Sequence, residues 1–300
     1  MMKVPRREGI LPSIKEGETP SLPISFVEIV RDTMKGIIFC ADDFALHGSV
    51  SLGIARLAHL KRISATSAMV LSPFWKRDAV LLEDLRGHLD VGLHLDWTSD
   101  FALAAGYGSS LGTAMRRALL GGFHRQHTRG VIARQLDLFE AHWQAVPDHV
   151  DGHQHVHQFA GIREALVDEL MHRYGSLHVK PYLRLSRSGT ADFKAWVIAN
   201  MGANALELIA TNARLSSARA LFGIYNFSGD TARYTMLMTR WLAQSSHGDI
   251  LMCHPSLTAE PGDTLGTARS QEFDYLSGPA FAQALTQAHV TLVRGQQVLT

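Results

Sequence analysis

The chain alternates between short apolar runs and longer stretches in which apolar residues recur at helical spacing. The first run, GIIFCA at 36–41, is compact and ends in a polar turn, which is typical of a buried strand. Similar runs predict strands at 65–72, 88–95, 148–152, 178–185, 249–253 and 290–293. Helical spacing predicts helices at 49–62, 75–85, 128–143, 162–174, 231–244 and 278–289, with a mostly helical segment at 191–222.

Strands and helices that alternate in this way predict βα units and a parallel sheet. About seven units over roughly 265 residues favour an α/β fold of the (β/α)-barrel type, a distorted TIM-type barrel with about seven parallel strands, over a small doubly wound sheet. We find no repeat or Gly-, Ser- or Pro-rich linker after residue 35, so we expect one catalytic domain over 35–300. Two longer segments, 96–127 and 255–276, follow strand ends, where lids and substrate loops usually lie.

Residues 1–34 differ from the rest of the chain, and we expect them to form a flexible N-terminal extension. They lack an apolar core followed by a small-residue cleavage site, which a secretory signal would show. The only cysteines, Cys40 and Cys253, provide no disulfide framework and no Cys-rich zinc module. The sequence therefore predicts a cytoplasmic protein.

Composition excludes several classes of partner. The hydrophobic fraction of 46% and the charged fraction of 19% are typical of a globular chain, and the formal net charge of +1 argues against a polybasic nucleic-acid binder. No apolar run approaches the roughly 18–20 residues that span a bilayer. We expect no nucleic-acid partner and no membrane span. The oligomeric state is open, and a homodimer is compatible with the sequence.

The 16 histidines are clustered, and the clusters follow predicted strands. Asp42 and Asp43 end the first strand, His94 ends the third, the segment 151–158 (DGHQHVHQ) follows the fourth, and His254 follows the strand at 249–253. In parallel α/β folds the carboxyl ends of the strands form the active-site edge. These residues are therefore expected to converge on one pocket.

The acidic pair is expected to divide two tasks. Neighbouring residues in an extended segment point to opposite sides, so one aspartate could bind a metal while the other takes a proton from water. Along 151–158, His153, His155 and His157 share one side if the segment is extended, and His153 and His157 share a face if it is helical. Either arrangement is compatible with metal ligation.

One set of these residues is suited to a metal. Asp43, His94 and His153 together form an Asp-His-His facial set that leaves positions open for water and substrate. His254 precedes Pro255 at a strand end, where its imidazole could protonate a leaving group.

Four motifs carry a resemblance to a known family. CADDFAL (40–46), VGLHLD (91–96), HVDGHQHVH (149–157) and LMCHPS (251–256) resemble, in order and spacing, the YdjC family of ChbG/HpnK-type carbohydrate deacetylases. The similarity extends over about residues 36–295. It implies a (β/α)-barrel-like fold, one divalent metal ion (Mg²⁺ or Zn²⁺) and hydrolysis of an N-acetyl group from an amino sugar, such as an acetylated chitooligosaccharide.

The resemblance also implies roles for individual residues. The positions that match the family's metal ligands are Asp43, His94 and His153. Asp42 matches the proposed general base and His254 a plausible general acid, while His155 and His157 match further histidines that line the site. One position departs from the family, which usually has glycine where this chain has Ala45; if the backbone there needs a positive φ, alanine costs about 1 kcal/mol.

Two further residues, Trp97 and Arg184, are candidates for substrate contact on their position alone. Other readings stay open at this stage. The same ligand set could cleave another amide, an ester or a phosphate, although the chain has no GxxxxGK[ST] phosphate-binding loop. The site could also be an inactive metal- or sugar-binding module, but simple metal holding would need neither Asp42 nor His254. A structural subunit with an incidental histidine-rich loop is a third reading.

Overall fold

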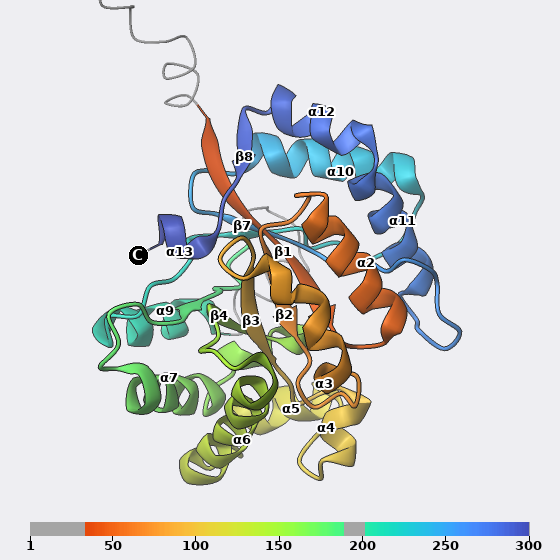
Figure 1. The fold of residues 1–300 in the computed structure, drawn as a ribbon. Coiled ribbons are helices and arrows are strands. Elements are labelled where there is room, and N and C mark those ends of the chain that lie inside the picture. Colours follow the sequence, from red (N-terminus) through yellow and green to blue (C-terminus); the bar gives the residue numbers. More distant parts are fainter. Residues whose placement is uncertain (1–33, 189–201, 300) are drawn as a thin grey trace, which may run out of the picture. The chain divides into compact units, whose positions relative to one another are not determined.

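The computed structural model describes residues 34–188 and 202–299, in which parallel strands form one sheet. The strands are β1 (Lys35–Phe44), β2 (Ala65–Ala68), β3 (Asp90–Leu95), β4 (His149–Gly152), β5 (Tyr182–Leu183), β6 (Leu221–Phe222), β7 (Ile250–Cys253) and β8 (Val290–Leu292). Their order is β5-β4-β3-β2-β1-β7-β6. The strand β8 pairs with the start of β1, beside which it lies in Figure 1. Each of these strand pairs is parallel.

The two ends of this strand order are joined. Isolated parallel bridges connect Leu183 with Ser217 and Ser188 with Leu221, so the segments after β5 and before β6 close the gap between those strands. Seven consecutive strands therefore follow a barrel-like path, and β8 lies outside that path beside β1. This confirms the predicted (β/α)-barrel-like α/β fold. The predicted extension at 1–34 lies, apart from Met34, outside the described residues.

Helices flank the sheet (Figure 1). The α-helices are α2 (Gly48–His59), α3 (Trp75–Asp78), α4 (Asp100–Ala104), α5 (Leu111–Leu119), α6 (Arg125–Trp143), α7 (Ile162–Tyr174), α9 (Ala203–Asn212), α10 (Thr231–Gln244), α11 (Gly266–Ser277), α12 (Pro279–Gln287) and α13 (Gly295–Val298). The described residues also contain two 3₁₀ segments, Ala79–Leu85 and His153–Gln158. Among the described residues, no helix has both the length and the apolar character needed to cross a membrane.

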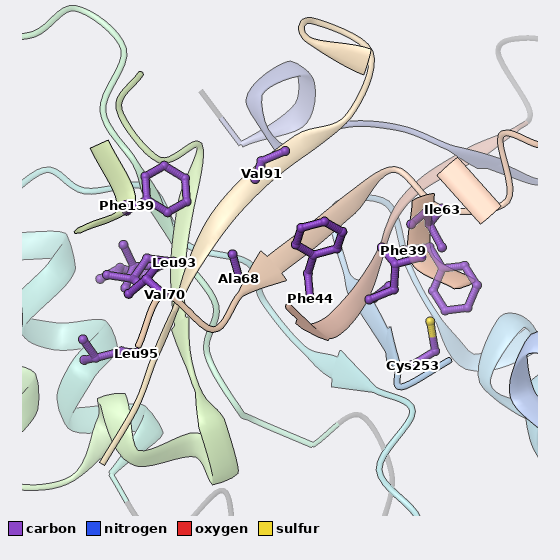
Figure 2. Packing of buried hydrophobic residues seen from close by; sticks show 14 of the residues in the cluster. Phe39, Phe44, Ile63, Ala68, Val70, Val91, Leu93, Leu95, Phe139 and Cys253 are labelled. Carbon is purple, nitrogen blue, oxygen red and sulfur yellow. The ribbon is translucent and has the colours of Figure 1, made fainter. Parts of the chain in front are cut away.

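The core lies between the sheet and these helices (Figure 2). Every residue of β3 is buried, as expected for a parallel strand that is covered on both faces. On the helix side, Trp75 stacks on Phe139 with ring centroids 5.5 Å apart and meets Phe44 edge-on at 6.2 Å. Such aromatic contacts contribute stability beyond that of the apolar area that they bury. They also fix the position of β1, which carries the acidic pair.

Two segments that we expected to be loops contain helices. The segment 96–127 includes α4 and α5, and α11 fills the end of 255–276. The apolar period of α11 is weak because this helix buries the charged residues Arg269 and Glu272, which a sequence pattern assigns to the surface. The segment 191–222 is helical at Ala203–Asn212 but also contains the short strand β6, while 189–201 lies outside the described residues.

A polar cluster closes the amino-terminal end of the barrel. Asp90, at the start of β3, accepts hydrogen bonds from the Tyr182 hydroxyl and from the backbone N–H of Gln296, both at 3.3 Å. Arg294 lies 3.7 Å from the other carboxylate oxygen. Burial, and then the neighbouring Asp148 carboxylate, raise the pKa of Asp90 to about 7.

This pKa predicts a pH-dependent stability. Because the pKa is higher in the folded state than the ordinary 3.8, the carboxyl favours folding at low pH, and this contribution is lost as the pH rises toward 7. The neutral variant Asp90→Asn lacks this pH dependence. Its unfolding free energy relative to that of wild type should therefore rise by about 2 kcal/mol from pH 5 to pH 8. Urea unfolding at both pH values measures the change. The control is Asp274→Asn, at an exposed carboxylate on α11, which should show no such gain. A stability difference for Asp90→Asn that does not change with pH would contradict the argument.

Candidate metal centre and active-site cavity

A cavity of about 470 Å³ lies at the carboxyl ends of the strands. Its polar wall includes Asp42, Asp43, His94, His153, Gln154, His155 and His254, which come from β1, β3, the segment after β4 and the segment after β7. Apolar side chains of α5 and of the segments around β6 and β7 form much of the remaining wall: Leu111, Met115, Ile224, Tyr225, Phe227, Met252 and Leu265. The structure therefore brings the predicted carboxylates and histidines into one pocket.

The acidic pair does not point to opposite sides as the extended pattern predicts. Asp43 has a φ of 68°, in the left-handed region, and both carboxylates border the same cavity. Ala45 is also left-handed, with a φ of 70°, and its side chain is fully buried. The position that resembles a family glycine therefore does need a positive φ, and this backbone costs a residue with a Cβ about 1–2 kcal/mol. Strained backbone of this kind often occurs at functional sites.

The residues Asp43, His94 and His153 converge on one point. The Oδ1 atom of Asp43 lies 3.3 Å from His94 Nε2 and 3.1 Å from His153 Nδ1, and the three ligand atoms lie within 4.8 Å of one another. On its other side His94 donates from Nδ1 to Asp151 Oδ1 at 2.6 Å. That hydrogen bond holds Nδ1 as the donor and leaves Nε2 as the atom that can bind an ion once its own proton is lost, which is the usual support of a metal-ligating histidine. These residues therefore fit a divalent ion.

Charges tune this triad. Burial alone would raise the pKa of Asp43, but Arg269 and the hydrogen bonds of His153 and His94 hold it well below its ordinary value. Burial also disfavours the charged form of His94, yet the Asp151 carboxylate raises the pKa of His94 to about 10. Without a cation, His94 is therefore protonated at neutral pH, and a metal ion must displace that proton in order to bind.

Asp42 has different partners. It accepts a hydrogen bond from Arg184 NH1 at 2.6 Å and a longer one from the Ser67 hydroxyl at 3.3 Å, both on Oδ1. The same guanidinium nitrogen lies 3.0 Å from Asp151 Oδ2, so Arg184 connects the two carboxylates. The other oxygen of Asp42, Oδ2, lies 3.8 Å from His254 Nε2. The pair Asp42 and His254 thus stands beside the triad and not within it.

The backbone holds His254 at the cavity wall. Its N–H donates to Glu272 Oε2 at 2.6 Å, and its ring meets Phe227 edge-on at 5.1 Å. Burial lowers the pKa of His254 to about 4, although Asp42 and Asp43 oppose this shift. The imidazole is therefore neutral at neutral pH and can accept a proton.

The histidine segment is neither the extended strand nor the regular helix that we considered. It forms a 3₁₀ turn in which Gln154 and His155 take left-handed φ values of 51° and 62°. This turn leaves His153 and His155 at the cavity, whereas His157 is fully buried and donates from Nε2 to the backbone carbonyl of Arg184 at 2.7 Å. His157 thus supports the strand end and does not line the cavity.

The structure places the two other expected substrate contacts away from the cavity wall. Arg184 is 1% exposed and lies beneath the carboxylates that it binds. Trp97 is buried against Tyr107 and Phe123, with ring centroids 5.9 Å and 6.3 Å away. Both follow strand ends, but an inward-facing side chain there can belong to the core as well as to the site.

Three residues with direct roles in this geometry were given no role from the sequence. Asp151 was expected at the pocket as part of the segment 151–158, whereas Arg269 and Glu272 lie on α11, inside the segment that we expected to be a loop. The motif HVDGH could have identified Asp151 as the partner of a ligand histidine. No local pattern indicates that Arg269 reaches a residue 226 positions earlier in the chain.

Among the described residues, two other groups of potential ligands lie close together, and both are weaker candidates. Cys40, His149 and Asp151 lie together inside the barrel, but burial raises the pKa of the Cys40 thiol well above its ordinary value, which disfavours the thiolate that a metal needs. In the group Asp42, His94 and Asp151, the guanidinium of Arg184 already lies between the two carboxylates. The triad of Asp43, His94 and His153 remains the site best suited to a cation.

Comparison with known proteins decides the family. Residues 36–287 match the family described as YdjC-like protein, which is more than half of the chain. The chain belongs to the YdjC-like family. No curated protein matches it. Membership confirms the resemblance carried by the four motifs, and the YdjC-like region includes every residue of the cavity wall.

A solved structure shares this fold. An Enterococcus faecalis protein provisionally described as a cellobiose-phosphate cleavage protein matches with a TM-score of 0.65 and 19% identity, covering 89% of this chain and 100% of that chain. A mutant of a CE4 family pseudoenzyme with restored enzymatic activity gives a TM-score of 0.42 and 11% identity, covering 89% of this chain and 68% of that one. The first likeness establishes a shared fold.

Proposed function

We propose that this YdjC-like protein is a metal-dependent hydrolase that removes an N-acetyl group from an amino sugar. The observation that carries the proposal is the pairing of two functions in one cavity. A triad suited to a cation (Asp43, His94 and His153) lies beside a proton-transfer pair (Asp42 and His254) that metal holding alone would not require.

The residues divide the reaction between them. A divalent ion held by the triad would polarise the acetamide carbonyl and make water more acidic. Asp42 accepts a proton from the attacking water, whose oxygen forms a bond to the carbonyl carbon. His254 is neutral in the resting site, so it must gain a proton before it can act as an acid, and Asp42 at 3.8 Å is the nearby source. The protonated imidazole then gives the proton to the nitrogen as the C–N bond breaks, which yields acetate and a free amine.

The donor set favours some cations over others. Two imidazoles and one carboxylate suit Zn²⁺ and similar transition ions, whereas Mg²⁺ prefers oxygen ligands and retains its water. We therefore rank Zn²⁺ before Mg²⁺ as the resident ion. The apolar wall formed by Leu111, Met115, Phe227 and Leu265 would pack against the sugar ring or a substituent on it.

Acetate release tests the function directly. We expect the metal-loaded protein to release acetate from N,N′-diacetylchitobiose or another N-acetylated sugar, and we expect chelation to abolish the release until Zn²⁺ or Mg²⁺ is restored. A parallel panel of simple amides, acetate esters and phosphate esters tests the competing hydrolase activities. Metal-dependent turnover of an ester or a phosphate without any from acetylated sugars would replace the proposal. Absence of all turnover while metal stays bound would favour an inactive binding module.

A further inference from the structure

The second oxygen of Asp43 has a partner of its own. Arg269, on α11, donates from NH2 to Asp43 Oδ2 at 2.7 Å, and this guanidinium is only 3% exposed. The first oxygen, Oδ1, is the atom that faces both His94 and His153. The two oxygens of the Asp43 carboxylate thus have different partners. Oδ2 pairs with the buried guanidinium of Arg269, and Oδ1 faces the candidate metal position.

Arg269 is itself held from the far side. Its Nε lies 2.9 Å from Asp263 Oδ2, and the same oxygen lies 3.3 Å from His47 Nε2. The backbone carbonyl of Arg269 accepts from Ser256 N–H at 3.1 Å, close to the end of β7. Asp263 also accepts from the N–H of Leu265, which lines the cavity. The guanidinium therefore has little freedom to leave Asp43.

We propose that Arg269 is a positioning residue that restricts Asp43 to a single ligating oxygen and offsets part of its charge. This inference rests on the proposed metal site. A free aspartate can grip a cation with both oxygens, whereas a guanidinium on Oδ2 leaves only Oδ1. A fixed positive charge beside the ligand weakens cation binding but leaves the bound ion more electron-poor. Arg269 thus lowers the affinity for the metal. In return, the bound ion is a stronger Lewis acid and has more coordination positions open to water and substrate.

Cobalt titration of the full chain tests this proposal without substrate. Co²⁺ substitutes for Zn²⁺ in many sites, and its visible absorption reports the number of ligands. In Arg269→Gln we expect a weaker and shifted absorption, because Asp43 can then bind through both oxygens, and an affinity for Co²⁺ that rises roughly tenfold. Arg269→Lys keeps the charge but cannot contact Asp43 and Asp263 together, so its spectrum should be intermediate.

The control is Arg173→Gln, an arginine on α7 that also pairs with several carboxylates but lies outside the cavity lining, and it should retain the wild-type spectrum. A wild-type spectrum and affinity in both Arg269 variants would overturn the proposal. So would a loss of Co²⁺ binding by both folded variants, because Arg269 would then be needed for affinity. If Arg269→Gln does not fold, the spectrum of Arg269→Lys alone tests the proposal.

The same samples separate this inference from the proposed function. If wild type binds Co²⁺ but releases no acetate, the proposed reaction is wrong, and the spectra of the variants still test the role of Arg269. If wild type binds no Co²⁺, the metal site and this inference fail together.

Discussion

Replacing Asp42 with asparagine is expected to lower kcat for acetate release by about 10²–10⁴-fold while the metal stays bound. Asparagine keeps the shape of the side chain and an oxygen that can accept the hydrogen bond from Arg184. It removes the basic carboxylate that would take a proton from water. The three residues suited to the metal are Asp43, His94 and His153, so none of them is changed.

Two measurements on the same preparation separate these effects. Metal content per chain after dialysis should equal that of wild type, while the steady-state rate with saturating sugar falls. The matched control is Asp90→Asn, which neutralises a buried aspartate at the other end of the barrel and should retain the wild-type rate. Wild-type turnover by Asp42→Asn would remove Asp42 as the general base, and His254, whose lowered pKa leaves its imidazole neutral, would become the candidate in its place.

The positions of the candidate site could be predicted because they follow from topology. In a parallel sheet all strand ends of one polarity lie at one edge, so finding the strands from apolar runs was sufficient to bring Asp43, His94 and His153 together. Their separation of up to 110 residues in sequence does not matter to that argument. The order and spacing of the four motifs then identified the family.

The features that could not be predicted from the sequence depend on backbone strain and on buried charged residues. Alternation along a strand predicted opposite directions for Asp42 and Asp43, but the left-handed φ of Asp43 turns both toward the cavity. Periodicity treats charged residues as exposed, so α11, which buries Arg269 and Glu272, looked like a loop. Position at a strand end also could not distinguish a substrate contact from a buried support, and Arg184 is a support in this structure.

Those buried charged residues determine the net charge of the site. The carboxylates of Asp42, Asp43, Asp151 and Asp263 outnumber the two guanidiniums that pair with them (Arg184 and Arg269), so negative charge exceeds positive charge here. A buried charge without a counterion is costly. In the absence of a cation, the raised pKa of His94 keeps a proton on this histidine, and that proton supplies part of the missing positive charge. A divalent ion would supply it instead, so the same imbalance that attracts a proton also favours the metal.

Removal of His153 should abolish metal binding and turnover together. This histidine is the most exposed member of the triad, at 19% of its side chain, so His153→Ala should cost little folding stability by itself. Loss of a supporting residue alone weakens metal affinity about 10–100-fold, so loss of a ligand should exceed that range. Wild type with metal at 100 times its Kd should gain about 2.7 kcal/mol in unfolding free energy, and the variant should gain almost none.

The matched control for this variant is His155→Ala. His155 comes from the same turn and borders the same cavity, but its Nδ1 lies 2.9 Å from the Ser186 hydroxyl and the residue is outside the triad. Thermal unfolding with and without Zn²⁺, followed by acetate release from the same samples, gives both readouts. We expect His155→Ala to keep the metal-induced stabilisation and His153→Ala to lose it. Equal stabilisation of both variants would show that the cation is held elsewhere, because a site that needs Asp43, His94 and His153 cannot lose one of three ligands without effect.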